Sequence, residues 1–252
     1  EVVARLRQRK GRKDKPFAVM ASSIEEAERM AYIPGSAREL LLSPRKPIVL
    51  CCRRPEYPLS ELVAPGQKTV GILLPYSPLH HLILEGKKVL VMTSANFSDE
   101  PIVSSNEKAL SALSGIADFF LFHDREIYVA IDDSVAAPLG RSYFLLRRAR
   151  GYTPAPMALH ADSPVIFGAG AEMKSSFSVS KGDLVFPGQY LGDMKQRETA
   201  VYYGRAMKHF LRLYELTPEY LAHDLHPQFL STATALGNLP GFTGEKLAVQ
   251  HH

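Results

Sequence analysis

Short apolar runs alternate with amphipathic segments along the chain, and the two kinds of segment predict strands and helices in turn. Strands are predicted at residues 17–20, 47–52, 69–74, 88–93, 117–122, 127–131 and 142–147. Ser22 and Ser23 form capping boxes with Glu25 and Glu26, which predicts a helix that ends near Tyr32. Further helices are predicted from Val2, after Ser77, and over roughly residues 104–114.

The pattern changes after Gly151. Residues 151–164 carry Pro, Ala and His without periodicity, which predicts an interdomain linker with a boundary near residue 160. Beyond it we expect a buried strand at 165–167 and a hairpin built from 177–179 and 184–186 around a turn at Gly182. A long amphipathic helix is expected between Val201 and Tyr214.

This alternation predicts an α/β protein. The 252 residues are enough for two compact domains, each with its own core. We expect them at residues 1–158 and 159–252.

Composition narrows the class of protein further. The net charge is only +4, but the basic residues between Arg5 and Lys15 have few acidic neighbours, which favours a local anion site over a general nucleic-acid surface. Cys51 and Cys52 are adjacent in a predicted strand and point to opposite faces, so they are expected to stay reduced. The sequence has neither a signal-peptide pattern nor an apolar run long enough to span a membrane, and we expect a cytoplasmic protein.

Residues 121–151 carry the most informative chemistry. Three polar clusters, His123-Asp124-Arg125, Asp132-Asp133-Ser134 and Arg147-Arg148-Ala149-Arg150-Gly151, are separated by apolar runs and are therefore expected near strand ends. Arginines close to a hydroxyl and two carboxylates suit a polyphosphate with its magnesium ion. Asp132 or Asp133 would either hold the magnesium ion or orient the arginines, and the sequence leaves both roles open.

Three other clusters have a functional and a plain structural interpretation. The basic turn Lys10–Pro16 suits a small anion or a solvated loop. The turn Thr93–Asn96 suits nucleotide oxygens or is an ordinary turn. His80 and His81 are more often packing residues than metal ligands.

The order of these clusters resembles a known family. The chain is similar to the YrdC-like domain of the hydrogenase-maturation carbamoyltransferases, the HypF family, over most of residues 5–157. The motifs that carry the resemblance are Arg9-Lys10, Lys15-Pro16-Phe17-Ala18-Val19-Met20, Leu74-Pro75-Tyr76-Ser77-Pro78-Leu79-His80, Thr93-Ser94-Ala95-Asn96, His123-Asp124-Arg125, Asp132-Asp133-Ser134-Val135 and Leu146-Arg147-Arg148-Ala149-Arg150-Gly151-Tyr152. The resemblance implies a twisted open mixed sheet with helices.

The resemblance also implies ATP-dependent formation of carbamoyl-adenylate from carbamate, which derives from carbamoyl phosphate. Lys15, helped by Arg9 and Lys10, would hold the carbamate and the reacting phosphate. The nucleotide and its magnesium ion would be bound by the remaining candidates, Ser94, Asn96, Arg125, Ser134, Arg147 and Arg148.

The second part resembles the next domain of the same family, an actin-like (ASKHA, RNase H-like) α/β domain that transfers the carbamoyl group. Its motifs here are Gly168-Ala169-Gly170-Ala171-Glu172-Met173-Lys174, Gly188-Gln189-Tyr190-Leu191-Gly192-Asp193, Asp224-Leu225-His226-Pro227 and Gln250-His251-His252. The resemblance implies that Lys174 faces the phosphates, that Asp193 or Asp224 contributes to the site, and that His251 is a ligand of Zn²⁺ or Fe²⁺. The acceptor would be the C-terminal cysteine of a partner hydrogenase-maturation protein.

The family pattern extends beyond both ends of the sequence, so we expect a fragment. It would lack the acylphosphatase-like domain, the zinc fingers and most of the transferase domain. Two alternative functions remain. A threonylcarbamoyl-adenylate synthase for tRNA modification shares the Lys-Pro and Ser-Ala-Asn motifs, but the motifs after Gly168 are not expected in it. A double-stranded RNA-binding module would use the basic segment 5–15, although this segment has no aromatic residue.

Overall fold

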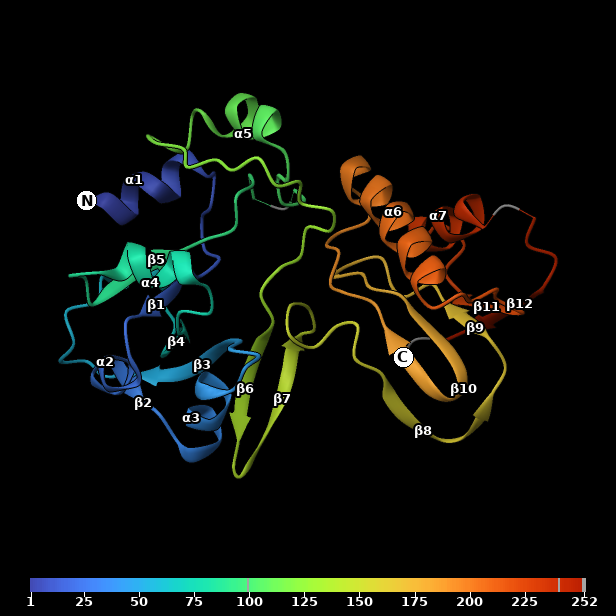
Figure 1. Ribbon diagram of the computed structural model, residues 1–252, viewed down its shortest axis with the longest axis horizontal. Coiled ribbons are helices and arrows are strands. Elements are labelled where there is room, and N and C mark those ends of the chain that lie inside the picture. The colour runs from blue at the N-terminus through green and yellow to red at the C-terminus, as the bar shows by residue number, and fades with distance from the viewer. Residues whose placement is uncertain (99, 240, 251–252) are drawn as a thin grey trace. The chain divides into compact units, whose positions relative to one another are not determined.

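The computed structural model describes residues 1–98, 100–239 and 241–250. The chain forms two compact units (Figure 1). The first unit consists of Glu1–Ser98, Ser105–Glu126 and Asp132–Tyr152. The second consists of 100–104, Ile127–Ile131, 153–239 and 241–250, so two short segments that precede Tyr152 in the sequence pack with the residues that follow it.

The first unit combines helices with one mixed sheet. Its helices are α1 (Val2–Arg9), α2 (Ile24–Met30), α3 (Gly35–Leu42), α4 (Pro78–Leu84) and α5 (Asn106–Leu113), with a 3-10 turn η1 (Glu61–Val63). Its strands are β1 (Ala18–Ala21), β2 (Ala31–Tyr32), β3 (Ile48–Arg53), β4 (Thr69–Leu73), β5 (Val89–Met92), β6 (Val135–Leu139) and β7 (Ser142–Arg147). The described strands follow the order β5-β1-β4-β3-β6-β7, and β2 pairs with β3.

Parallel and antiparallel pairs both occur in this sheet. β1 runs parallel to β4, and β3 runs parallel to β6. The other pairs, β1–β5, β3–β4, β2–β3 and β6–β7, are antiparallel. The parallel β3–β6 pair brings the Asp132–Ser134 cluster beside the beginning of β3, since the Ile48 amide donates to the Ser134 carbonyl at 2.8 Å.

Serine side chains determine where three helices begin. Ser23, Ser77 and Ser105 lie at the N-caps of α2, α4 and α5, and each accepts a hydrogen bond from the backbone N–H three residues later. Such a cap satisfies one of the amides that lack a partner in the first turn.

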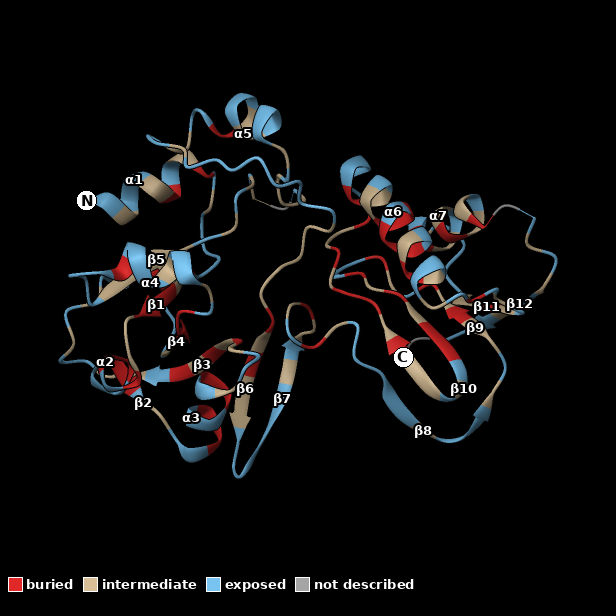
Figure 2. Cartoon of the chain, in the orientation of Figure 1, coloured by how far each residue is buried: buried red, intermediate tan, exposed pale blue. Residues whose placement is uncertain are grey.

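The central strands are covered on both faces, as the buried positions in Figure 2 indicate. Val19, Val49 and Ile72 belong to the core that contains residues of α2 and α3. The next residues along β1 and β4, Met20 and Leu73, pack with Leu84 of α4. Because successive strand residues point to opposite faces, α2 and α3 cover one face and α4 covers the other.

The second unit has its own mixed sheet and aromatic core. Its elements are β8 (Met157–Ser163), β9 (Ile166–Gly168), β10 (Ser178–Pro187), α6 (Arg197–Leu213), β11 (Tyr220–Asp224), α7 (Leu230–Asn238) and β12 (Glu245–Val249). The strand order is β12-β11-β9-β10-β8, with α6 and α7 over the sheet in Figure 1. Phe177 packs with its ring centroid 5.3–5.7 Å from those of Phe167, Tyr203 and Phe210.

Most predicted elements are confirmed, including the helix begun by Ser23, the strands near residues 48, 69, 89 and 142, and the long helix of the second half. Cys51 is buried and Cys52 is exposed, and both thiols are free, as predicted for neighbours on opposite faces of β3. Among the described residues, no helix is long and apolar enough to cross a membrane.

Two strand predictions are wrong. Residues 117–122 and 127–131 are irregular, although their apolar content is typical of strands. Phe119 is 93 % exposed, and the carbonyl of Ala130 accepts hydrogen bonds from the side chains of Gln189 and Tyr202. An apolar run becomes a strand only when a neighbouring strand supplies its backbone partners.

The hairpin and the linker also differ from prediction. Residues 178–187 form one strand, β10, whose first residues pair with β9 and whose later residues pair with β8. Gly182, at a φ of +60°, lies at a bulge in this strand instead of a chain reversal. The predicted linker contains β8, and the units divide after Tyr152.

The aromatic core generates a stability prediction. Replacing Phe177 by Ala removes a ring that contacts three other aromatic side chains, so the expected loss in the free energy of unfolding is about 3–5 kcal/mol. Urea denaturation followed by far-ultraviolet circular dichroism measures it. Val201→Ala in α6, where the side chain is 57 % exposed, is the control, and an equal loss in both variants would contradict the proposed core.

Candidate functional site

Lys10 joins two clusters that are far apart in the sequence. It lies at the C-cap of α1 and is 1 % exposed. Its Nζ donates to the Ser94 carbonyl at 2.5 Å and to Asn96 Oδ1 at 3.3 Å, and the Ser94 hydroxyl also donates to Asn96 Oδ1 at 2.7 Å. Burial, and secondly the charge of Arg12, lower the pKa of Lys10 to about 8.

Arg7 holds the basic turn in place and was not singled out from the sequence. It is buried, and its guanidinium donates to the carbonyls of Arg12, Lys13 and Lys15, as well as to those of Leu62 and Val63. These bonds hold the basic turn in one conformation. The spacing in the sequence could have indicated the burial of Arg7, because residues three apart lie on the same face of a helix and Arg7 and Lys10 both lie on the inward face of α1.

The other basic candidates of this region have different surroundings. Arg9 forms an ion pair with Asp118 at 2.7 Å and donates to the Ile116 carbonyl, so its guanidinium does not share the partners of Lys10. Lys15 is exposed at the end of the basic turn, just before β1. Arg125 is exposed in the irregular segment before Asp132.

Both carboxylates of the Asp132–Asp133 pair face arginines. Asp132 Oδ1 lies 3.2 Å from Arg147, and Asp133 Oδ1 lies 2.7 Å from Arg150. Burial raises the pKa of the Asp132 carboxyl, and the charge of Arg147 opposes this rise. Of the two roles left open by the sequence, these contacts favour orientation of the arginines.

Ser134 has a structural role in this cluster. It is fully buried, its hydroxyl accepts from the Ala149 amide at 2.8 Å, and it donates to the Arg150 carbonyl at 2.9 Å. The hydroxyl therefore connects the beginning of β6 to the segment after β7. Contact between Ser134 and a polyphosphate stays a prediction.

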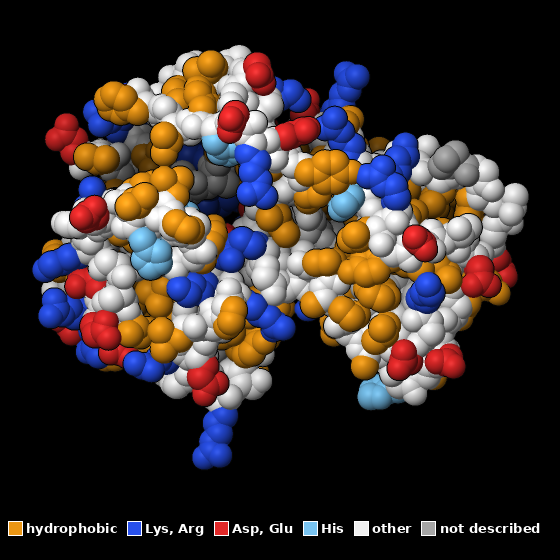
Figure 3. Space-filling view, in the orientation of Figure 1, with side chains coloured by type: hydrophobic (Ala, Val, Ile, Leu, Met, Phe, Trp, Pro, Cys, Tyr) orange, Lys and Arg blue, Asp and Glu red, His pale blue; other side chains and the backbone are white. Residues whose placement is uncertain are grey.

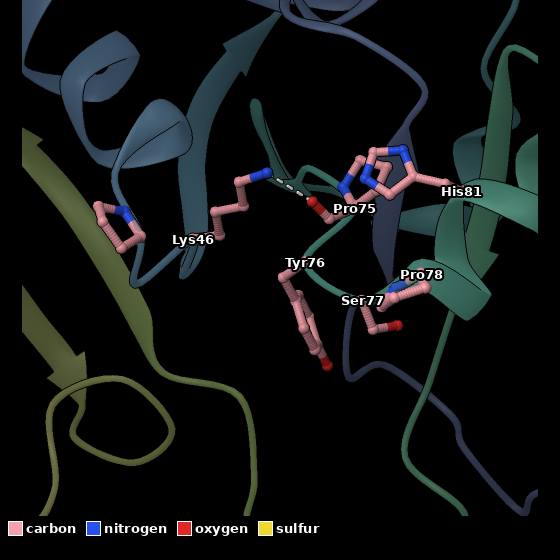
Figure 4. Close-up of a pocket in the computed structure, with 7 residues that line it drawn as sticks. Lys46, Pro75, Tyr76, Ser77, Pro78 and His81 are labelled. Atoms are coloured by element: carbon pink, nitrogen blue, oxygen red, sulfur yellow. Dashed lines mark hydrogen bonds between the residues drawn. The ribbon is translucent and has the colours of Figure 1, made fainter.

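A pocket of about 290 Å³ opens beside this cluster. Lys46, Tyr76, Ser77 and His81 line it together with three prolines, and Figure 4 shows the Lys46 side chain reaching the Pro75 carbonyl. That hydrogen bond measures 2.6 Å. The guanidinium carbon of Arg150 lies 3.5 Å from the centroid of the Tyr76 ring, which connects the pocket wall to Asp133. Burial, and then the charge of Asp133, raise the pKa of Tyr76 to about 12.

Of the candidates in the second unit, Lys174 and Asp193 lie in loops, and Asp224 is the last residue of β11. Lys174 is exposed in a left-handed conformation, Asp193 accepts from the Lys195 amide, and Asp224 accepts from the His226 amide. His251 lies outside the described residues. In the described part of the chain, no group of three or more His, Cys, Asp and Glu is arranged to hold a metal ion.

Glu172 is a second residue that the sequence analysis did not single out. It is buried, and its carboxylate accepts from the amides of Leu230 and Ser231 at the start of α7, while the Ser231 hydroxyl donates to the Gly170 carbonyl. Gly170 has a φ of +72°, and a Cβ there would lie 1.8 Å from the Ser176 carbonyl oxygen. Only glycine fits this loop.

The described residues on the face of the first unit drawn in Figure 3 form no single block of positive charge. In Figure 3, Lys and Arg side chains are interspersed with acidic and hydrophobic side chains over the visible face of the first unit. This distribution differs from the continuous basic stripe that is typical of nucleic-acid surfaces.

The first unit thus has the architecture of a YrdC-like α/β domain, with an open mixed sheet and polar clusters at its strand ends. Residues 1–149 match the Sua5/YciO/YrdC family, described as telomere recombination, and residues 161–252 match the HypF Kae1-like domain. The chain belongs to the Sua5/YciO/YrdC family, and the resemblance to the HypF family is confirmed over both units.

Named relatives agree with this assignment. Carbamoyltransferase HypF of Rhizobium leguminosarum bv. viciae is 41 % identical over 98 % of this chain, and HypF2 of Cupriavidus necator is 39 % identical over all of it. The chain covers 33 % and 34 % of these two relatives, about a third of their length.

Solved structures are similar over the same range. Full-length HypF in a phosphate- and nucleotide-bound form has a TM-score of 0.93 at 39 % identity, with 99 % of this chain and 39 % of that chain covered. HypF of T. kodakarensis has a TM-score of 0.95 at 36 % identity, with 100 % and 33 % covered. P. abyssi Sua5 complexed with L-threonine, at 18 % identity and a TM-score of 0.52, shares the fold, with 98 % of this chain and 86 % of that chain covered.

The burial of Lys10 generates a pH prediction. We expect its amine to titrate near pH 8, and Arg12→Gln to raise this pKa because it removes a neighbouring positive charge. The unfolded chain keeps this proton until about pH 10.4, so between these values it binds more protons than the folded chain, and folding stability rises with pH. Nitrogen-15 NMR of the Lys10 Nζ measures this pKa, and a titration midpoint above pH 10 would contradict the burial of the amine. In the Lys10→Met variant, the part of the rise in folding stability with pH that comes from Lys10 should be absent.

Ser134 generates a second stability prediction. Ser134→Ala removes a buried hydroxyl and leaves the Ala149 amide and the Arg150 carbonyl without this partner, so we expect a loss of about 1–3 kcal/mol in the free energy of unfolding. Urea denaturation measures it, with the exposed Ser111→Ala as control. Equal stability of the two variants would show that Ser134 is not a structural link.

Proposed function

We propose that the first unit forms carbamoyl-adenylate from ATP and carbamate, and that the second unit belongs to a domain that transfers the carbamoyl group onward. One observation carries the proposal: the buried Lys10 amine joins the basic turn to the Ser94–Asn96 turn. These two clusters are separate in the sequence, and an anion site needs both a charge and oriented polar groups. The relatives named carbamoyltransferase HypF support the assignment to this reaction.

The proposed reaction needs positioning and charge neutralisation more than covalent chemistry. A carbamate oxygen attacks the α-phosphorus of ATP, the new P–O bond forms as the bond to the β-phosphate breaks, and pyrophosphate leaves. Lys15 and Lys10 would hold the carbamate and the reacting phosphate. Arg147, oriented by Asp132, would face the remaining phosphates together with Arg125. Arg148 lies near Arg45, Tyr143 and Tyr152 instead, so it has no part in the proposed phosphate site.

The charge of Lys10 suits this role at neutral pH. With a pKa of about 8 the amine is mostly protonated at pH 7, and its burial removes the water that would otherwise screen the charge. A magnesium ion bound to ATP would neutralise part of the phosphate charge. Asp132 and Asp133 already pair with arginines, so neither is assigned as a ligand of this ion.

The source of the carbamate and the acceptor of the carbamoyl group are inferred from the longer relatives named carbamoyltransferase HypF. Carbamoyl phosphate would be the source of carbamate, and a hydrogenase-maturation protein with a C-terminal cysteine would be the acceptor. We also propose a cytoplasmic location, which two free cysteines in one strand suit. A Zn²⁺ or Fe²⁺ site in the second unit has no set of described ligands, so no step is assigned to it.

Threonylcarbamoyl-adenylate synthesis is the second candidate. The shared fold with Sua5 favours it. The match of residues 161–252 to the HypF Kae1-like domain favours carbamoyl transfer instead.

ATP–pyrophosphate exchange tests the proposal. With magnesium present, we expect the chain to catalyse exchange with ammonium bicarbonate, which supplies carbamate. Lys10→Met should reduce the rate by at least about 100-fold, because it removes the buried charge. Lys13→Gln, in the same turn but exposed, is the matched control.

The alternatives give different results. Exchange that requires L-threonine together with bicarbonate would assign the chain to the threonylcarbamoyl branch. Equal rates for the Lys10 and Lys13 variants would contradict the role of the buried amine.

A further inference from the structure

A second pocket, of about 380 Å³, lies between α3 and β7 of the first unit. Ser36 and Leu40 of α3 line it together with Ser43 at the C-cap of this helix, and Tyr143 of β7 and Tyr152 also line it. This volume is within the range of pockets that hold small molecules.

This pocket is distinct from the candidate site in Figure 4. The two pockets share only Pro44 among their lining residues. Tyr143 lies on the same face of β7 as Leu145, which packs against the core that contains Leu40 of α3. The second pocket therefore lies on the α3 face of the sheet, whereas the first is lined by the beginning of α4.

Arg45, which lines the pocket, has a second guanidinium near it. The guanidinium carbon of Arg45 lies 4.6 Å from the centroid of the Tyr152 ring. Burial, and then the charge of Arg45, lower the pKa of Arg148, which places a second guanidinium nearby. Two neighbouring guanidiniums favour an anion because its charge relieves their repulsion.

The backbone of Arg45 is held in place. Its carbonyl accepts from Arg150 at 3.1 Å, and the Lys46 carbonyl accepts from the same guanidinium at 2.8 Å. Gly151 packs so closely on Arg45 that a Cβ there would lie 3.1 Å from its backbone. A fixed backbone lowers the entropy cost of presenting the Arg45 side chain to a ligand.

The other walls suit a flat ring. Tyr143 is 38 % exposed, its ring centroid lies 6.4 Å from that of Tyr152, and Leu40 and Pro44 add apolar surface. Aromatic side chains favour offset or edge-to-face contacts with a second ring. Glu39 also lines the pocket, and its carboxylate disfavours a second acidic group on the ligand.

We propose that the pocket between α3 and β7 binds a small molecule in which a planar ring carries one acidic group, with the acidic group at Arg45 and the ring against Tyr143. This site is independent of the proposed carbamoyl chemistry. Phosphate and carboxylate share the anionic chemistry that a guanidinium recognises.

Fluorine NMR of the chain labelled with 3-fluorotyrosine tests the proposal, with phenyl phosphate as the probe. Tyr→Phe variants assign the signals of Tyr143 and Tyr152, which report on this pocket, and of Tyr76, which reports on the other. We expect saturable shifts at Tyr143 and Tyr152. Inorganic phosphate, phenol and benzoate separate the contributions of the acidic group and the ring.

Two variants and one control complete the experiment. Arg45→Gln should weaken binding by about tenfold or more, because it removes the charged partner of the acidic group. Tyr143→Ala should weaken it through loss of the ring contact, and it leaves the charges in place. Arg54→Gln is the matched control, since Arg54 also lies over a tyrosine ring, at 4.1 Å from Tyr32, but does not line this pocket.

Four results would overturn the proposal. They are shifts at Tyr76 alone, no saturation at millimolar phenyl phosphate, equal affinity for inorganic phosphate, and equal weakening by Arg45→Gln and Arg54→Gln. Equal affinity for inorganic phosphate would show that the ring contributes nothing.

Discussion

The arrangement of the first unit depends on the contacts of one guanidinium, that of Arg150. It pairs with Asp133 before β6, donates to the carbonyls of Arg45 and Lys46 before β3, and lies over the Tyr76 ring before α4. Three loops far apart in the sequence are thereby tied to the end of β7. Because Arg has five donors in a rigid plane, a lysine cannot make the same set of contacts.

Cationic side chains also order the loops beside β5 and β1, toward the opposite edge of the sheet from β7. Arg7 holds the carbonyls of the basic turn, and Lys10 reaches from the same helix face to the Ser94–Asn96 turn. In both places cationic side chains order backbone carbonyls: Arg7 and Lys10 are buried, and Arg150 is partly buried. Buried charges are stable only when such partners are present, so the loops around them are held in defined conformations. A preorganised set of polar groups is what a reaction governed by positioning requires.

Much of the fold was predictable from local patterns. Capping serines marked the starts of α2, α4 and α5, and β-branched runs marked β3, β4 and β5, because caps and alternation act over a few residues. The errors share one cause. Backbone hydrogen-bond partners decide whether an apolar run is a strand, a loop or one bent strand, and these partners lie elsewhere in the sequence. The segments predicted wrongly for this reason are residues 117–122, 127–131 and 178–187.

The sequence by itself determined the family, the α/β class and the clusters that carry the chemistry, since motif order and composition are properties of the chain alone. Only the tertiary structure decided which clusters meet. It paired Lys10 with Asn96 and Asp132 with Arg147, turned Arg9 toward Asp118, and buried the Ser134 hydroxyl in a structural link. The physical reason is that strand order and long-range hydrogen bonds determine these distances, and neither follows from spacing along the chain.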